Sequence, residues 1–394
     1  MISVLEAQEK VLQYTTLSPS KIVDISDALA CVLSVDVFAP IDYPPFWQSS
    51  MDGYAVQFDD GATLQVIGEV QAGNAPTFVV EKGRAARIFT GAPLPKGANC
   101  VVMQEQVNRV GGIVTIAPSA KRFYGAYTRA KGAQIKKGAL ALKKGTYLSA
   151  AAIGFLASLG INTVAVYAAP KVAIVVTGDE LVDVGEPLQF GQIYESNGIT
   201  LSSALAAMHL SEDINFYRLE DNAKATEELF STLLNRFNVL LISGGISVGD
   251  YDFVGKSLLN LGVETIFYKV AQKPGKPLFF GQTADTLIFA LPGNPASALV
   301  CFYEYVYPAL RKMMGHTSCF LPKLQLEVSH DIPKKMARAC FYRAKISDDG
   351  KTVRSLEGQE SFMMQSFAVA DALLYVPAEN TFTAKGSLVE VHKM

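Results

Sequence analysis

The chain has 394 residues, of which 49% are hydrophobic, and its formal net charge is −2. This length and composition indicate roughly two to four globular domains, and the balanced charge excludes the basic field with which proteins gather nucleic acid. Five scattered cysteines without a CxxC pair favour reduced thiols, and therefore the cytoplasm, over a disulfide or zinc framework.

The N-terminal turns contain charged residues, which predicts an amphipathic helix rather than a secretory signal. Residues 145–170 carry no charge and are long enough to cross a bilayer as a helix. However, Gly160 and Asn162 interrupt this stretch. It divides into a helical part, Ala150–Leu159, and a β-branched part, Thr163–Tyr167. We therefore expect a buried helix followed by a strand, and no membrane span.

The spacing of the predicted elements indicates four domains. Residues 170–317 alternate strand and helix, which predicts an α/β core with a mostly parallel sheet. Residues 41–137 contain short β-like runs between glycines and prolines, and residues 318–394 predict a small β-barrel. We expect residues 1–40 and 138–169 to form a discontinuous domain into which 41–137 is inserted.

Polar clusters follow four predicted strands of the α/β core. They are T-G-D-E-L (177–181), L-E-D (219–221), S-G-G-I-S-V-G-D-Y-D (243–252) and L-P-G-N-P-A-S (291–297). Because the carboxyl ends of parallel strands share one edge of the sheet, these clusters are expected to meet around one ligand.

The glycine-rich cluster predicts an anion site that also holds a metal. Bare amides of a glycine loop suit a phosphate, but Asp250 and Asp252 would repel it. Each contact at ~4 Å costs about 1 kcal/mol in water and about 4 kcal/mol at an effective dielectric of 20. A divalent cation between the charges resolves this conflict, and oxygen ligands favour Mg²⁺ over zinc. Taken singly, however, each acid is more simply a helix cap or a solvated loop residue.

A second anion site is predicted at Lys269–Pro277, K-V-A-Q-K-P-G-K-P, which we call the lysine loop. Two prolines and a glycine hold three lysines close together, which favours an oxyanion clamp over a solvated loop. The four histidines are isolated in the sequence, and no Ser-His-Asp or Cys-His pair is indicated. Hydrolysis through a nucleophilic side chain is therefore not expected.

Six motifs together resemble one family. S-M-D-G-Y-A (50–55), T-G-A-P-L-P-K-G (90–97), T-G-D-E-L, S-G-G-I-S-V-G-D-Y-D, K-P-G-K-P (273–277) and L-P-G-N-P (291–295) occur in the order found in molybdopterin molybdenumtransferases of the MoeA and gephyrin E-domain type. The resemblance runs over nearly the whole chain. It implies insertion of molybdate into adenylylated molybdopterin with release of AMP and a requirement for Mg²⁺. It also implies a homodimer whose sites are shared between subunits, and contact with the molybdopterin adenylyltransferase.

The resemblance also implies which residues form the site. The catalytic set is Asp52, Thr90, Glu180, Asp221 and Asp252, of which Asp221 and Asp252 hold the metal. The substrate-binding set is Gly244, Gly245, Ser247, Gly249, Asp250, Lys269, Lys273, Lys276, Pro277, Pro292, Asn294, Pro295, Ser297, Arg343 and Ser361.

Two departures from the family pattern stand out. Ala133 and Gln134 occupy positions where an acidic pair is usual, and Glu360 precedes Ser361 where a glycine is common. Two other functions stay open: a gephyrin-like binding scaffold, and a molybdopterin adenylyltransferase. The lysines, arginine and acids favour the enzyme over a scaffold, which has no need of opposed charges. The modules around the α/β core and the lysine loop fit the molybdenumtransferase better than the adenylyltransferase.

Overall fold

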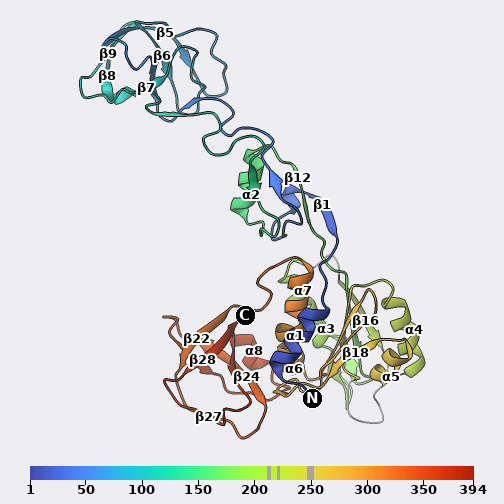
Figure 1. Ribbon diagram of the computed structural model, residues 1–394. Coiled ribbons are helices and arrows are strands. Elements are labelled where there is room, and N and C mark those ends of the chain that lie inside the picture. The colour runs from blue at the N-terminus through green and yellow to red at the C-terminus, as the bar shows by residue number, and fades with distance from the viewer. Residues whose placement is uncertain (211–213, 220–221, 246–252) are drawn as a thin grey trace. The chain divides into compact units, whose positions relative to one another are not determined.

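The computed structural model describes residues 1–210, 214–219, 222–245 and 253–394 (Figure 1). Their contacts divide the chain into two compact units. Unit 1 comprises Met1–Lys21, Ala30–Ser34 and Val166–Met394. Unit 2 comprises Ile22–Leu29 and Val35–Ala165.

Unit 1 contains a six-stranded sheet. In spatial order its strands are β16 (Ile214–Leu219), β13 (Val172–Thr177), β17 (Val239–Ser243), β21 (Leu287–Leu291), β20 (Phe279–Gln282) and β18 (Glu264–Tyr268). The first four are parallel, and β20 runs antiparallel to both of its neighbours. The predicted α/β fold with a mostly parallel sheet is confirmed.

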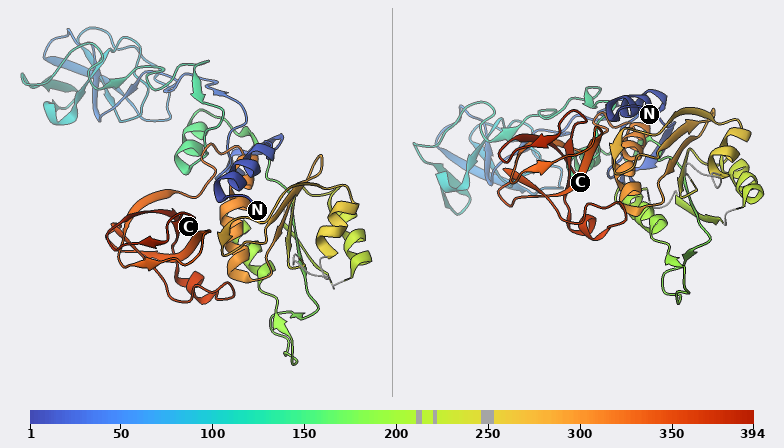
Figure 2. Two further views of the ribbon diagram at one scale, coloured as in Figure 1. Left: turned by 60° about the horizontal axis from the view of Figure 1, so that its bottom comes forward. Right: turned by 90° about the horizontal axis from the view of Figure 1, so that it is seen from below.

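Helices cover both faces of this sheet. One face packs on α1 (Val4–Tyr14), α3 (Asn197–Ala206), α6 (Pro295–Cys301) and α7 (Tyr307–Met313), the other on α4 (Ala223–Leu233) and α5 (Phe253–Asn260) (Figures 1 and 2). Because side chains alternate along a strand, Ile174 and Leu241 enter the first core, whereas Val175 and Ile242 enter the second. This two-sided burial explains why β13, β17 and β21 are continuous apolar runs.

Residues near the N-terminus contribute to both units. Helix α1 buries its apolar face in the α/β core of unit 1, whereas β2 (Val37–Phe38) pairs with β11 (Leu140–Leu142) in unit 2. Strand β1 (Ser20–Asp24) pairs with β12 (Thr163–Tyr167), which follows α2 (Ala150–Ser158). The uncharged stretch around α2 and β12 is therefore a helix and a strand, as predicted. The expectation that this helix is buried is wrong, because Leu156 is the one buried residue of α2. Among the helices that the structure describes, none has both the length and the apolar character of a membrane span.

The sheet of unit 2 is built from short strands. In spatial order they are β7 (Cys100–Met103), β4 (Gly53–Val56), β6 (Arg84–Ile88), β5 (Thr63–Val70), β9 (Ile113–Ile116) and β8 (Val107–Val110). Gly53 is required here because a Cβ atom at this position would lie 1.9 Å from the Val102 carbonyl oxygen. The strand pairing thus needs the glycine of the S-M-D-G-Y-A motif.

The C-terminal region of unit 1 is a closed five-stranded barrel, which confirms the predicted small β-barrel. Its strands are β24 (Ala339–Ile346), β25 (Thr352–Ser355), β22 (Lys323–Val328), β28 (Leu388–Lys393) and β26 (Ala372–Val376), and β26 pairs back onto β24. Strand β19 (Gln272–Lys273) also pairs with β24, so the lysine loop is joined to the barrel.

Shorter elements complete the structure. They are η1 (Ile25–Asp27), β3 (Gln48–Ser49), η2 (Gln104–Gln106), β10 (Thr128–Arg129), β14 (Leu181–Val182), β15 (Ile193–Tyr194), the π-helical segment η4 (Phe302–Val306), β23 (Ile332–Pro333), α8 (Gln365–Val369) and β27 (Phe382–Thr383). Segment η4 joins α6 directly to α7.

Candidate active site

A cavity of about 710 Å³ lies at the carboxyl ends of β13, β17 and β21. Glu180 contributes from the segment after β13, Gly244 and Gly245 follow β17, and Pro292 and Asn294 follow β21. These three polar clusters therefore meet at one edge of the sheet, where open α/β sheets bind ligands. Pro277 of the lysine loop and Pro295 also line this cavity.

The glycines after β17 are required by the shape of the cavity wall. Gly244 has φ +95°, and a Cβ atom there would lie 2.6 Å from the Thr177 carbonyl oxygen. Gly245 has φ +65°, and its Cβ would lie 2.5 Å from the side chain of Val254. Only glycine fits both positions, so bare backbone faces the cavity.

Three cavity residues were missed as site residues by the sequence reasoning. Thr177 has a buried hydroxyl that finds no hydrogen-bond partner among the described residues, which is unusual for a protein interior. Asn197 donates from Nδ2 to Ser243 Oγ (2.8 Å) and to the Gly293 carbonyl (2.7 Å), and so ties together the segments after β17 and β21. Glu195 is buried and accepts from the amide of Gly198 at 2.6 Å.

A signal for these residues exists in the sequence. Glu195, Ser196 and Asn197 stand just before and at the first position of α3, where short polar side chains and carboxylates are favoured because helical amides are unpaired. Thr177 belongs to the T-G-D-E-L cluster and ends β13.

The start of α6 binds a loop from the barrel. Asn294 occupies the N-cap position, but its side chain makes no capping bond and instead donates to Ser361 Oγ at 2.9 Å. The amide of Ala296 donates to the Ser361 carbonyl at 3.1 Å. Ser361 is therefore held beside the cavity, which Phe362 helps to line. Ser297 is buried in the first turn of α6.

Arg343 is completely buried and holds the segment before Ser361. Its Nη2 donates to the carbonyls of Gly358 (2.6 Å) and Glu360 (3.0 Å), and its Nε donates to Ser366 Oγ (3.1 Å). Burial lowers the pKa of Arg343 to about 10, although Glu360 opposes this shift. Its Nη1 is buried with no partner among the residues that the structure describes, and Arg343 is not among the residues that line either the large cavity or the cavity beside Lys273.

The lysines of the lysine loop differ in their surroundings. Lys273 and Lys276 are exposed, whereas the ammonium of Lys269 lies 4.7 Å from the ring centroid of Tyr268. Lys273 borders a second cavity of about 230 Å³, whose other lining residues include Tyr342 of the barrel. The structure thus places the lysine loop between the large cavity, which Pro277 lines, and the barrel.

Asp52 and Thr90 lie together in unit 2. The amide and the hydroxyl of Thr90 both donate to Asp52 Oδ1, each at 2.8 Å. The bond from the amide lowers the pKa of Asp52 most, and the bond from the hydroxyl lowers it further. The positive charge of Arg87 adds to the effect. The carboxylate is therefore ionised at neutral pH. In the same unit, Ala133 and Gln134 are exposed.

Five predicted site residues lie outside the described residues. They are Asp221, Ser247, Gly249, Asp250 and Asp252. Both predicted metal ligands are among them. Within the described ranges, no three His, Cys, Asp or Glu side chains are grouped closely enough to hold a metal ion.

The fold and the site define a multidomain protein with an α/β core whose cavity lies beyond the carboxyl ends of its strands. The chain belongs to the molybdopterin molybdenumtransferase (MoeA) family. Family models match it as the MoeA N-terminal region (domain I and II) at residues 2–160, as a probable molybdopterin binding domain at 173–312, and as the MoeA C-terminal region (domain IV) at 325–394.

Relatives match over most of their length. The chain is 34% identical over 400 residues to a molybdopterin molybdenumtransferase of Haemophilus influenzae, covering 99% of this chain and 98% of the relative. It is 39% identical over 323 residues to a molybdopterin molybdenumtransferase of Nostoc sp., covering 79% of this chain and 73% of the relative. Among solved structures, a molybdopterin biosynthesis MoeA protein from Pyrococcus horikosii matches with a TM-score of 0.84 and 32% identity, covering 100% of this chain and 99% of that one.

Proposed function

We propose that this molybdopterin molybdenumtransferase inserts molybdate into adenylylated molybdopterin and releases AMP. The observation that carries the proposal is the cavity of about 710 Å³ at the strand ends, with bare backbone at Gly244 and Gly245. Backbone amides in such loops bind phosphate groups. The hydroxyl of Thr177, which has no hydrogen-bond partner in the described part of the chain, supplies a further polar group beside these glycines.

Magnesium fits the donor set of this site. Glu180 lines the cavity, and Asp221 and Asp252 follow in the sequence after β16 and β17, the two strands that flank β13. Carboxylate oxygens are the ligands that Mg²⁺ prefers. When bound by Asp221 and Asp252, the cation would neutralise the pyrophosphate and make its phosphorus more electrophilic. In this proposal Glu180 faces the ligand, and Asp52, whose pKa is lowered by its two bonds from Thr90, supplies a further carboxylate.

Molybdate is the second substrate, and cationic donors are proposed to bind it. Lys273 and Lys276 are exposed, Arg343 keeps Nη1 unpartnered among the described residues, and Ser361 offers a hydroxyl beside the cavity. Charge-assisted hydrogen bonds of this kind are what a dianion requires.

The same proposal covers the partners and the setting of the enzyme. We propose a cytoplasmic homodimer in which unit 2 of one subunit completes the site on unit 1 of the other, and which contacts the molybdopterin adenylyltransferase. The resemblance supports this arrangement. The five free cysteines support a reducing compartment.

Replacing Gly244 tests the role of the cavity. In Gly244→Ala the new methyl group would collide with the backbone of Thr177, so the wall of the cavity must move. We expect AMP release from adenylylated molybdopterin, with Mg²⁺ and molybdate present, to fall at least about tenfold. The matched control is Gly262→Ala, which also has positive φ (+76°) but meets nothing within 4 Å.

Loss of AMP release in both variants to the same extent would mean that backbone strain, and not the cavity wall, is responsible. Wild-type AMP release in Gly244→Ala would overturn the assignment of the cavity.

A further inference from the structure

The lysine loop has one exposed face and one buried face. Lys273 and Lys276 are exposed, whereas Gln272, Pro274 and Gly275 between and beside them are buried. Gln272 is 0% exposed. A buried amide is costly unless both its oxygen and its nitrogen find partners, so the partners of Gln272 decide how the loop sits.

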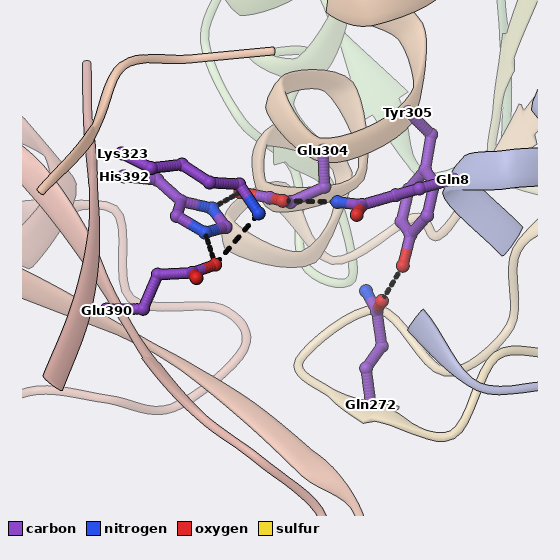
Figure 3. Close-up of polar contacts among 7 residues, drawn as sticks. All are labelled: Gln8, Gln272, Glu304, Tyr305, Lys323, Glu390 and His392. Atoms are coloured by element: carbon purple, nitrogen blue, oxygen red, sulfur yellow. Dashed lines mark hydrogen bonds and ion pairs between the residues drawn. The ribbon is translucent and has the colours of Figure 1, made fainter. Parts of the chain in front are cut away.

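The side chain of Gln272 is bonded at both ends (Figure 3). Its Oε1 accepts a hydrogen bond from the hydroxyl of Tyr305, which is itself completely buried. Its Nε2 donates to the Pro274 carbonyl at 2.9 Å, across the turn that separates the two lysines. Burial raises the pKa of Tyr305 well above its ordinary value, so its hydroxyl keeps the proton that it donates.

The turn itself is pressed against the helix below it. Gly275 has φ +86°, and a Cβ atom there would lie 2.5 Å from Cys301 Sγ and 2.8 Å from Gln272 Nε2. The thiol of Cys301 also donates to the Gly275 carbonyl at 3.6 Å. The buried face of the lysine loop is thus seated on α6 and η4.

Segment η4 turns two neighbouring polar side chains in different directions. Glu304 points to Gln8 of α1 and to His392 of the barrel, whereas Tyr305 points to Gln272 (Figure 3). Such π-helical turns are rare, and they occur frequently at functional sites. Here Glu304 holds the barrel, and the next residue of the turn, Tyr305, holds the lysine loop.

We propose that Tyr305 and Gln272 are positioning residues for the oxyanion: by fixing the buried face of the lysine loop, they hold Lys273 and Lys276 out together toward molybdate. This inference rests on the proposed function, in which the lysine loop binds the oxyanion. Neither residue is expected to touch the ligand, because both are buried beneath the loop.

Tyr305→Phe removes the donor and keeps the ring. We expect the molybdate concentration at half-saturation to rise about threefold to tenfold, the range for losing one hydrogen bond, while kcat at saturating molybdate stays within about twofold. Calorimetric binding of molybdate alone is expected to weaken by the same factor, and amide exchange of residues 270–278 to become faster. The control Tyr303→Phe removes a half-buried hydroxyl from the same segment. It should leave the half-saturating molybdate concentration, the calorimetric affinity and the amide exchange unchanged.

Two further variants separate the possible failures. Gln272→Leu is expected to weaken molybdate binding in the same way, and Lys276→Ala tests the oxyanion site itself. If Lys276→Ala weakens binding but Tyr305→Phe and Gln272→Leu do not, the positioning role is wrong and the proposed function stands. If Lys276→Ala and the two other variants all bind normally, the lysine loop is not the oxyanion site. Weaker binding with unchanged exchange of residues 270–278 would also overturn the positioning role.

Discussion

Asp52 and Thr90 are 38 residues apart in the chain, yet they share two hydrogen bonds. The residues alone predicted only an ordinary turn at Asp52, and it was the resemblance to the MoeA family that singled out both positions. Their contact depends on the antiparallel pairing of β4 with β6, which places Gly53 opposite Ile88. No local pattern encodes this register, because it is set by which strands become neighbours.

Removing the hydroxyl of Thr90 is expected to change the ionisation of Asp52. In Thr90→Val one of the two bonds is lost, so the pKa of Asp52 should rise toward its ordinary value of 3.8. The pKa of Asp52 is lower in the folded protein than in the unfolded chain. The stabilisation by this carboxylate is therefore present at a pH above 3.8, and it is lost as the pH falls through the lowered pKa of the folded protein. Titration of the Asp52 carboxyl carbon by NMR, with the signal assigned from Asp52→Asn, measures the shift.

Thr115→Val, an exposed threonine of the same sheet, is the control and should leave this titration unchanged. An identical Asp52 titration in Thr90→Val and wild type would contradict the role given to the hydroxyl.

His392 is isolated in the sequence but not in the fold. Its ring nitrogens lie 2.7 Å from Glu304 Oε1 and 2.7 Å from Glu390 Oε1 (Figure 3). Gln8 donates to the other oxygen of Glu304 at 2.9 Å, and Lys323 donates to Glu390 at 2.8 Å. Burial would lower the pKa of His392, but Glu304, followed by Glu390, overcomes this effect and raises it to about 9.

Stability is therefore expected to fall at alkaline pH. Because the folded pKa of His392 is raised, its stabilisation is fully present below about 6.5 and is lost as the pH rises through about 9. The difference between the folded pKa of about 9 and the ordinary pKa of 6.5 corresponds to at most about 3 kcal/mol of the free energy of unfolding. The neighbouring Tyr375 stacks on the ring at 5.9 Å, and burial raises its pKa as well, so it stays neutral across this range.

Thermal unfolding between pH 6 and pH 10 measures this effect. The midpoint of His392→Gln, whose amide can still donate to Glu304, should be lower than that of the wild type at pH 6 and approach it at pH 10. The control His209→Gln changes an exposed histidine and should follow the wild type. A constant gap between His392→Gln and wild type over this range would contradict the prediction.

At the scale of elements, the sequence from Pro295 to about Met314 predicts one long helix, and the structure divides this segment into α6, η4 and α7. A physical signal for the division was present. Pro308 has no amide hydrogen, and its ring would clash with the carbonyl of Glu304 in a regular α-helix. The wider π-helical turn just before it accommodates the proline. Periodicity alone does not reveal this change, because most side chains from Ala296 to Leu310 are buried and the segment has no single apolar face.

The strands of the α/β core, in contrast, were clear from the sequence. Strand β17 is buried throughout, and Leu241 at its centre is 0% exposed. Leu241→Ala is expected to lower the free energy of unfolding by about 2–5 kcal/mol, because it removes buried methyl groups and leaves a cavity. The same change at Leu259, which is 60% exposed in α5, should have an effect below about 0.5 kcal/mol.

Urea unfolding of both variants gives the comparison. Equal stability of Leu241→Ala and Leu259→Ala would mean that β17 is not a core strand.

At the scale of the whole molecule, the order of the motifs predicted the family, and the pattern of strands and helices predicted the α/β core and the barrel. It did not predict that Arg343 is buried and bonded to the carbonyls of Gly358 and Glu360, because those contacts depend on how the barrel loop folds back. Nor did it predict the link from Gln272 to Tyr305, since a buried glutamine has no recognisable spacing. Sequence patterns thus reveal the motifs around the cavity more readily than the buried residues that support them.

The proposed sharing of sites between subunits leads to a complementation experiment with two damaged chains. Asp52→Asn alters unit 2 and Glu180→Gln alters unit 1, so each variant alone should be nearly inactive. If each site combines unit 1 of one chain with unit 2 of the other, half of a random mixture is mixed dimers, and one of the two sites in each mixed dimer is intact. After unfolding and refolding together, the mixture should therefore recover about a quarter of the wild-type AMP release.

The control mixes Glu180→Gln with Lys276→Ala. Both changes lie in unit 1, so every site keeps one damaged residue and no activity should be gained. If the mixture of Asp52→Asn and Glu180→Gln gains no more than this control, although co-purification of differently tagged chains shows that mixed dimers form, each chain supplies its own Asp52. The site would then be complete within a single subunit, and the dimer would have to serve another purpose.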